Sequence, residues 1–187
     1  MCFYVQLDGF FTFFSSSLIF QTMSNSHFEE KSGVVCHETD FGKWYQTVSE
    51  VVILINLEKG TRGKEVIVDV KPNNLRCLVR GKLVLEGQLF YTIIVDESTW
   101  TIEDKELLRI QLVKMDERIK DIAWLSLFKN QYKPDPVVLT EMRKKLDLER
   151  FQMENPGFDF SGAKLDKRYE DQSINEMEKS VRNACLK

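Results

Sequence analysis

Between residues 44 and 114 the sequence consists of short runs in which apolar and polar residues alternate. Three of these runs place apolar residues at every second position: Val51, Ile53, Ile55 and Leu57; Val66, Val68 and Val70; and Leu108, Ile110 and Leu112. A period of two puts alternate side chains on opposite faces of a β-strand. Turn signals at Pro72-Asn73-Asn74 and Arg80-Gly81 separate the runs, and Gly87 is expected to end another. This spacing predicts a mainly β chain that folds as an antiparallel β-sandwich rather than a parallel sheet with helical crossovers.

An acidic stretch, residues 96–104, begins with Asp96 and surrounds Trp100. A catalytic carboxylate needs burial and a partner that shifts its pKa, whereas acidic residues in turns are usually solvated. We therefore interpret Asp96 and its acidic neighbours as a solvated turn. Trp44, Trp100 and Trp124 are expected to be buried anchors of the sandwich. Trp44, which opens the first strand, is expected to be the most exposed of the three.

The sequence gives little support to catalysis. Ser98 has no histidine in the strand-rich region to activate it, because His27 and His37 both precede that region. A glycine-rich phosphate loop is absent from the sequence. The four cysteines match no zinc or redox spacing, and Cys36 with His37 supplies only two ligands. We therefore predict no catalytic, cofactor-binding or metal-ligating residues, and a chain that is not an enzyme.

The net charge limits the kinds of partner that the chain can bind, and the cysteine pattern indicates its cellular compartment. A formal net charge of −3 is too close to neutral for the basic face that nucleic-acid binding needs. Cys77 lies in phase with an alternating apolar run and is expected to be a small core residue. The cysteine pattern favours a reducing, intracellular compartment. The basic run Arg143-Lys144-Lys145 is interpreted as a solvated helix face on which Glu141 pairs with Lys145.

Residues 1–22 are rich in phenylalanine and carry a single charge, at Asp8. They are too polar and interrupted to span a bilayer, and Lys31 is the first basic residue, which argues against a secretory signal or a mitochondrial presequence. We interpret residues 1–22 as an extension outside the fold that arises from a mistaken start site. A cleaved or anchoring segment is the alternative. Residues 23–43 are expected to be an irregular lead-in and residues 44–133 the sandwich domain.

A helix is predicted after the sandwich, with Asp135 as its N-cap and Pro136 at its first position. One apolar stripe would dock on the sandwich: Val138, Leu139, Met142, Leu146 and Met153. A second apolar group lies on nearly the opposite side: Val137, Leu148 and Phe151. This second group needs a neighbour, either Phe158 and Phe160 or a partner protein. Asn155-Pro156-Gly157 is expected to end the helix, and Gly157 to permit a sharp return. We expect the two phenylalanines to clamp the helix within residues 134–165, because exposed paired aromatics favour aggregation.

The charged tail, residues 166–187, contains a capping box from Ser173 to Glu176 and one apolar stripe at helical spacing. An isolated helix of this length is marginal in water. We therefore expect the tail to be frayed unless something binds it.

Several of these residues together resemble the CS domain of the NudC family of chaperone proteins, a p23-like and small heat-shock-protein-like sandwich. The matching elements are Trp44-Tyr45-Gln46, Gly60-Thr61, residues 96–100 and Trp124. The run from residue 148 to residue 163 is more specific and resembles the small family members that lack a long N-terminal coiled coil. Residues 28–35, near the N-terminal end of the matched region, also resemble these small family members. The resemblance covers residues 23–165, whereas residues 1–22 and the tail beyond Lys164 have no counterpart in it.

The resemblance implies a set of candidate protein-binding or signature residues: Trp44, Tyr45, Asp96, Trp100, Leu148, Phe151, Pro156, Phe158 and Phe160. It also implies a non-catalytic co-chaperone of heat-shock protein 90 that binds and stabilises client proteins. The implied partners include the lissencephaly protein and dynein-associated proteins, in the cytoplasm and at centrosomes, spindles and microtubules, with the chain a monomer or weak dimer. Two other classes stay open: a structural adaptor without holding activity, and an oligomeric small heat-shock protein. The Ile-x-Ile type of tail that small heat-shock proteins use is absent after Phe128.

Overall fold

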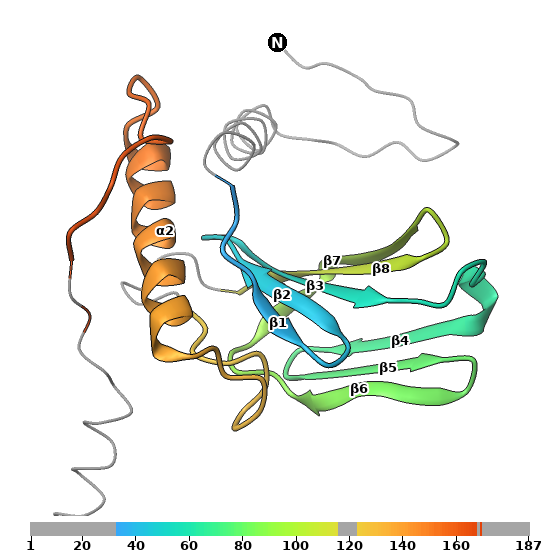
Figure 1. The fold of residues 1–187 in the computed structure, drawn as a ribbon. Coiled ribbons are helices and arrows are strands. Elements are labelled where there is room, and N and C mark those ends of the chain that lie inside the picture. Colours follow the sequence, from blue (N-terminus) through green and yellow to red (C-terminus); the bar gives the residue numbers. More distant parts are fainter. Residues whose placement is uncertain (1–32, 116–122, 168, 170–187) are drawn as a thin grey trace, which may run out of the picture.

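The computed structural model describes residues 33–115, 123–167 and 169, and most of them form two antiparallel sheets and one helix (Figure 1). The larger sheet has the order β1-β2-β3-β8-β7: β1 (His37–Thr39), β2 (Gly42–Gln46), β3 (Glu50–Asn56), β8 (Leu107–Lys114) and β7 (Ile93–Glu103). The smaller sheet has the order β4-β5-β6: β4 (Val66–Lys71), β5 (Asn74–Val79) and β6 (Lys82–Gln88). A short 3-10 helix, η1 (Gly63–Glu65), precedes β4. The predicted mainly β sandwich is confirmed.

The hydrophobic core fills the space between the two sheets. On β8, Leu108, Ile110 and Leu112 have no exposed surface, as their alternation predicts. Leu75 and Cys77 face the same core from β5, and burial raises the pKa of the Cys77 thiol to about 11. Each fully buried aliphatic side chain contributes about 1.5–3 kcal/mol. This shared core holds the two sheets together.

Two glycines have conformations that the turns require. Arg80 (φ 51°) and Gly81 (φ 74°) join β5 to β6 with both residues in the left-handed region, the geometry of a tight hairpin. The predicted hairpin at Arg80-Gly81 is therefore confirmed. Gly42 opens β2 at φ 145°, where a Cβ would lie 2.2 Å from the carbonyl oxygen of Leu54. Only glycine fits this close approach of two backbones.

The strands differ in two places from the sequence expectations. The three residues of β1 pair with residues 42–44 of β2, so ordered strands begin within residues 23–43. The His-Glu-Thr sequence of β1 has no apolar alternation that would have revealed it. The prediction that Gly87 ends a strand is wrong, because β6 continues to Gln88. The ring of Phe128 lies over Gly87, where a Cβ would be 2.5 Å from Cδ2 of that ring.

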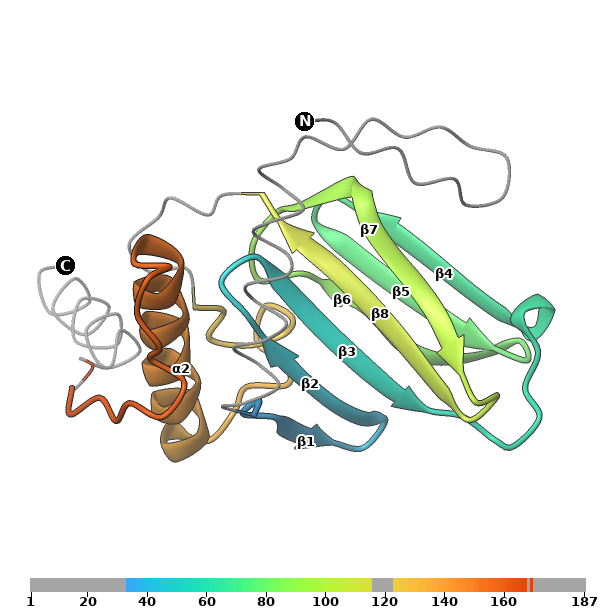
Figure 2. The same ribbon diagram turned by 90° about the horizontal axis from the view of Figure 1, so that it is seen from above.

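The helix α2 (Pro136–Glu154) stands across one end of the sandwich, beside β2 (Figures 1 and 2). Asp135 caps it as predicted: its Oδ1 accepts hydrogen bonds from the backbone N–H groups of Val137 (2.9 Å) and Val138 (3.1 Å). The docking stripe is buried at Leu139, Met142 and Leu146.

The stripe of α2 contacts the sandwich in two ways. Met142 joins the main core, while Leu146 forms a smaller cluster with Val48 and Ala123. The interpretation of residues 143–145 as a solvated face is wrong for Arg143, which is only 6% exposed. Lys144, the next residue, forms the expected kind of ion pair with Glu141 at 3.0 Å.

The predictions for residues 1–22 and for the helix starting at Ser173 lie outside the described residues. Within the described part of the chain, no helix is both long and apolar enough to cross a bilayer.

Candidate protein-binding surface

The chain reverses direction immediately after α2. The backbone N–H of Asn155 still bonds to the carbonyl oxygen of Phe151 at 3.0 Å, as in a helix. Pro156 follows, and the backbone N–H of Phe158 then donates to the carbonyl oxygen of Asn155 at 3.0 Å. This turn redirects the chain along the helix that it has just left. We call residues 155–163 the aromatic return.

Gln152 holds the aromatic return against α2. Its side-chain nitrogen donates to the carbonyl oxygen of Phe158 at 2.7 Å, and its side-chain oxygen accepts from the backbone N–H of Phe160 at 2.9 Å. Gln152 is only 9% exposed. A hydrogen bond contributes about 0.5–1.5 kcal/mol net, and a buried amide left unpaired costs about 1–3 kcal/mol. One side chain therefore fixes the backbone on both sides of Asp159.

Local hydrogen bonds complete the return. Oδ1 of Asp159 accepts from the backbone N–H of Ser161 at 3.0 Å and from its hydroxyl at 2.6 Å. The backbone N–H of Ala163 donates to the carbonyl oxygen of Phe160 at 3.0 Å. These bonds define the backbone of the turn without any need to bury the ring of Phe158.

The return carries an aromatic surface. The ring centroid of Phe160 lies 6.4 Å from that of Phe151 and 6.2 Å from that of Phe158. Phe160 and Phe151 are half-buried, as is Leu148 one helical turn before Phe151, whereas Phe158 is 69% exposed. We call Leu148, Phe151, Phe158 and Phe160 the aromatic patch.

The structure corrects the expected clamp. Phe160 does pack beside Phe151, but Phe158 projects into solvent, so the clamp is wrong for Phe158. Gly157 has no positive φ, and a Cβ there would meet nothing within 4 Å. The return therefore does not depend on glycine, because the Gln152 hydrogen bonds close it. Pro156 is exposed and serves to end the helix.

The tryptophans of the signature are structural. Trp44 and Trp124 are 0% and 1% exposed, and Trp100 packs partly buried against the same core. The prediction that Trp44 would be the most exposed is wrong, because this side chain points between the sheets. Its neighbour Tyr45 points to the opposite face of β2, where its hydroxyl accepts from the Arg109 guanidinium at 3.3 Å. Trp44, Tyr45 and Trp100 thus belong to the sandwich and not to the aromatic patch.

Asp96 lies within β7 and not in the predicted turn. The pairing of β7 with β8 shifts register between residues 94 and 99, so the ladder is irregular there and residues 95–98 of β7 lie opposite residue 112 alone. The hydroxyl of Ser98 fills the irregularity: it donates to the carbonyl oxygen of Ile94 at 2.7 Å and accepts from the backbone N–H of Val113 at 3.0 Å. Asp96 is exposed, as expected of a solvated carboxylate. The Ser98 hydroxyl therefore supports the sheet.

A buried lysine, missed from the sequence, lies where α2 meets the sandwich. Lys114 is 4% exposed, and its Nζ donates to the Thr47 carbonyl oxygen at 2.6 Å and to Oε1 of Gln46 at 3.1 Å. Burial lowers the pKa of Lys114 to about 7, although the nearby carboxylate of Glu149 acts in the opposite direction. Glu149 is 2% exposed, and its Oε2 accepts from the backbone N–H of Val48 at 2.9 Å.

Gln46 extends this buried polar group to the segment before α2. Its Oε1 accepts from the backbone N–H of Trp124 at 2.8 Å, and its Nε2 donates to the Trp124 carbonyl oxygen at 2.9 Å. The polar contacts therefore fix the position of α2, and with it the aromatic return, relative to the sandwich. The sequence did hold a signal, because Lys114 is in phase with Leu108 and Leu112, which point inward from the same strand.

A second exposed apolar surface lies on the outer face of the smaller sheet. Ile67, Leu78 and Leu83 oppose one another in register across β4, β5 and β6. Ile67 is 59% exposed and Leu83 is 53% exposed. Beside them, Arg76 and Glu86 form an ion pair at 3.6 Å. We call the three apolar residues the apolar row.

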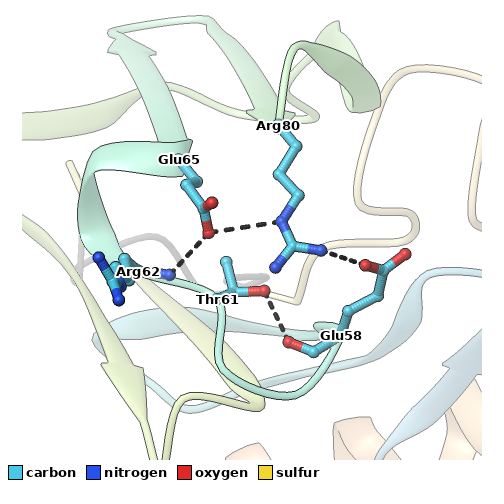
Figure 3. Close-up of polar contacts among 5 residues, drawn as sticks. All are labelled: Glu58, Thr61, Arg62, Glu65 and Arg80. Carbon is cyan, nitrogen blue, oxygen red and sulfur yellow. Dashed lines mark hydrogen bonds and ion pairs between the residues drawn. The ribbon is translucent and has the colours of Figure 1, made fainter.

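The acidic residues at the end of the smaller sheet hold turns together (Figure 3). Arg80 bonds to the carboxylates of Glu58 and Glu65, and the Thr61 hydroxyl donates to the Glu58 carbonyl oxygen at 2.6 Å. The backbone N–H of Arg62 donates to Glu65 at 3.0 Å and is the main cause that lowers the pKa of this carboxyl. The described residues contain no group of three or more His, Cys, Asp or Glu side chains that could ligate a metal ion.

Comparisons with known proteins match most of the chain. The family model of the CS domain matches residues 42–114. NudC domain-containing protein 2 of Homo sapiens is 45% identical over 142 residues, which cover 76% of this chain and 90% of the relative; the Rattus norvegicus and Mus musculus proteins match to the same extent. The nuclear movement protein nudc of Schizosaccharomyces pombe is 40% identical over 78 residues, 40% of this chain and 47% of the relative. The crystal structure of the Mus musculus NudC domain-containing protein 2 is 44% identical and covers 70% of this chain and 99% of that one, with a TM-score of 0.40.

Proposed function

The chain belongs to the NudC family of CS-domain proteins, a family of co-chaperones of heat-shock protein 90, and from this premise we propose that it binds and stabilises client proteins without catalysis. The partners are heat-shock protein 90 and clients of the lissencephaly-protein and dynein pathway. The place of action is the cytoplasm, including centrosomes and spindles. Family membership supports these partners and this location.

The observation that supports a binding role most directly is Phe158, a large exposed ring on a fixed backbone. Aromatic side chains dominate the energetics of protein interfaces, and a segment whose backbone is ordered beforehand loses less conformational freedom on binding. Gln152 supplies that order through its bonds to Phe158 and Phe160. Leu148 and Phe151 extend the apolar contact area beside the ring. The aromatic patch is therefore the surface on which we place the client.

The mechanism is passive binding. An apolar segment of an unstable client packs on the aromatic patch, and the bound form is removed from the pool that aggregates. A binder that recognises one form stabilises it by RT ln(1 + [L]/Kd), about 2.7 kcal/mol when the free binder is 100-fold above Kd. Because the sequence has no glycine-rich phosphate loop, a nucleotide-driven step belongs to the partner chaperone.

The test is a thermal aggregation assay with an aggregation-prone model client and three proteins: the natural chain, Phe158→Ser and Val137→Ser. Val137 is the matched control, because it is 73% exposed and lies at the other end of α2, outside the aromatic patch. We expect the natural chain and Val137→Ser to suppress light scattering equally, and Phe158→Ser to lose most of the protection. All three should have the same melting temperature, since neither side chain is buried.

Each other outcome points to a different function. If the natural chain gives no protection, the structural adaptor replaces the chaperone. If size-exclusion chromatography shows a large assembly, the chain acts as an oligomeric small heat-shock protein. If Phe158→Ser still protects the client, the chain binds clients through a surface other than the aromatic patch.

A further inference from the structure

After the aromatic return, the chain runs back along another side of α2, seen as the orange-red segment beside the helix in Figure 2. Here Lys167 and Tyr169 contact a group of charged residues that lies beside the sandwich stripe on α2. These helix residues are Arg143, Asp147 and Arg150, each three or four positions apart and therefore on one side of α2. We call them the charged triad.

Asp147 is the centre of the contact and is only 8% exposed. Its Oδ2 accepts from the Tyr169 hydroxyl at 2.7 Å and from Nζ of Lys167 at 2.7 Å. Its Oδ1 accepts from the Arg150 guanidinium at 2.7 Å. Two of these three donors come from the tail segment. One carboxylate thus recognises both a phenolic hydroxyl and an ammonium group.

The ring of Tyr169 is recognised separately from its hydroxyl. The guanidinium carbon of Arg143 lies 5.5 Å from the ring centroid, and Nζ of Lys167 lies 4.8 Å from it. Cations at these distances are attracted to the face of an aromatic ring. Burial raises the pKa of Tyr169, and the hydrogen bond to Asp147 raises it further, so the hydroxyl keeps the proton that it donates. Tyr169 therefore has the complementarity of a bound ligand: a cation against the ring and an acceptor for the hydroxyl.

We propose that the charged triad of α2 is a binding site for a tyrosyl side chain with a cation two residues before it, and that Tyr169 and Lys167 occupy it as an exchangeable internal ligand. The ligand class is an extended peptide with a Lys-x-Tyr sequence, carried by a partner protein. The site is distinct from the aromatic patch and does not depend on the proposed function.

The tail segment is suited to exchange. Its contacts with the triad are two hydrogen bonds to Asp147, one of which is also an ion pair, and one cation–ring contact. Although Asp147 is buried, an ion pair whose cation is half exposed is screened by solvent and contributes little net stability. Lys167, with about half of its side chain exposed, is such a partner. A short tether instead raises the local concentration of the internal ligand to the millimolar range. An external peptide therefore displaces the internal ligand when the ratio of its concentration to its dissociation constant exceeds the same ratio for the internal ligand.

The experiment uses the full chain with its internal ligand removed, Lys167→Ala/Tyr169→Ala, labelled with ¹⁵N for NMR. The probe is a synthetic peptide of residues 164–171, Lys-Leu-Asp-Lys-Arg-Tyr-Glu-Asp. We expect saturable shifts of the α2 amides around Asp147 with a dissociation constant of about 0.1 mM, tenfold below the millimolar local concentration of the internal ligand. The natural chain should bind the same peptide at least about tenfold more weakly, because the internal ligand competes. No binding to the double variant, or equal binding to both proteins, overturns the proposal.

Two controls separate recognition from folding. The added substitution Asp147→Asn should weaken peptide binding about tenfold, whereas Glu154→Gln, on the exposed end of α2, should leave it unchanged. If Asp147→Asn also lowers the melting temperature, the peptide variants carry the same test because they leave the protein intact. Replacing the peptide tyrosine by phenylalanine should weaken binding, and replacing it by alanine should abolish it. Peptides that bind equally well with tyrosine, phenylalanine or alanine contradict a tyrosyl site.

Discussion

Gln152 holds Phe158 through a hydrogen bond of 2.7 Å from its side-chain nitrogen to the backbone carbonyl oxygen, and the Phe158 ring is left exposed. The bond explains how an aromatic residue stays in solvent on an ordered turn. The backbone is fixed from the helix side, so the ring is free to contact another protein. Presentation of the ring and stability of the turn are therefore separable properties.

Replacing Gln152 with alanine should lower the free energy of unfolding by about 1–3 kcal/mol, because it leaves the Phe158 carbonyl and the Phe160 N–H without their partner. Urea denaturation measures the loss, and hydrogen exchange should become faster at Phe160. Glu154→Ala, an exposed neighbour, is the control and should change neither quantity. Equal stability of Gln152→Ala and the natural chain would contradict the role given to Gln152.

Lys114 should make the stability of the protein rise with pH above about 7. The folded-state pKa of Lys114 is about 7, well below its ordinary value of 10.5, because burial disfavours the charged amine. Between pH 7 and pH 10.5 the unfolded chain binds more protons than the folded chain. The free energy of unfolding therefore increases by at most about 1.4 kcal/mol for each pH unit. Below about pH 7 the lysine is charged in both states, and its contribution no longer changes.

The measurement for Lys114 is the free energy of unfolding from pH 6 to pH 9 for the natural chain, Lys114→Met and Lys82→Met. Lys82 is exposed, so its removal should leave the rise intact. The rise should be absent in Lys114→Met. Parallel curves for all three proteins would show that Lys114 keeps an ordinary pKa.

Two glycines should differ sharply in their tolerance of alanine. Gly87→Ala places a Cβ 2.5 Å from Cδ2 of Phe128 and should destabilise the fold by about 1–3 kcal/mol through overpacking. Gly157→Ala meets nothing within 4 Å and needs no positive φ, so the melting temperature should be unchanged or slightly higher. Thermal unfolding of the two variants decides the matter. A large loss in Gly157→Ala would mean that the return does require glycine.

The Ser98 hydroxyl should contribute to the stability of the larger sheet. Ser98→Ala removes the acceptor for the Val113 N–H and the donor to the Ile94 carbonyl, at a cost of about 1 kcal/mol. Asp96→Ala, two residues away and exposed, should be neutral within about 0.5 kcal/mol. Chemical denaturation compares the two. The reverse order would return Asp96 to consideration as a structural or functional group.

The sequence predicted the sandwich because alternation on β8 and the hairpin at Arg80-Gly81 each follow from local rules. It also located the start of α2, since Asp135 and Pro136 carry the capping signal themselves. It identified Trp44 as a buried anchor but ranked it as the most exposed of the three tryptophans, because the local pattern does not show that β1 pairs with the start of β2. The irregularity before Thr99 was missed for a related reason: whether extra residues fit into one strand depends on the partner strand.

Only part of the aromatic patch could be predicted from the sequence. Local spacing and the family resemblance brought Phe151, Phe158 and Phe160 together in one motif. They did not show that Phe158 is exposed, because that depends on the Gln152 hydrogen bonds. The burial of Lys114 and Arg143 was missed, because each is covered by residues distant in the chain. Lys114 contacts Gln46 and Thr47, and Arg143 contacts Tyr169, which follows the aromatic return.

Site-specific photo-crosslinking shows whether clients bind at the aromatic patch. A photoreactive phenylalanine analogue is placed at Phe158, at Val137 and at Leu83 of the apolar row, and each protein is irradiated with a thermally unfolding client. We expect client cross-links from position 158 and few from positions 137 and 83, although all three residues are more than half exposed. Cross-links that arise from position 83 and not from position 158 would contradict this expectation and place the client on the smaller sheet.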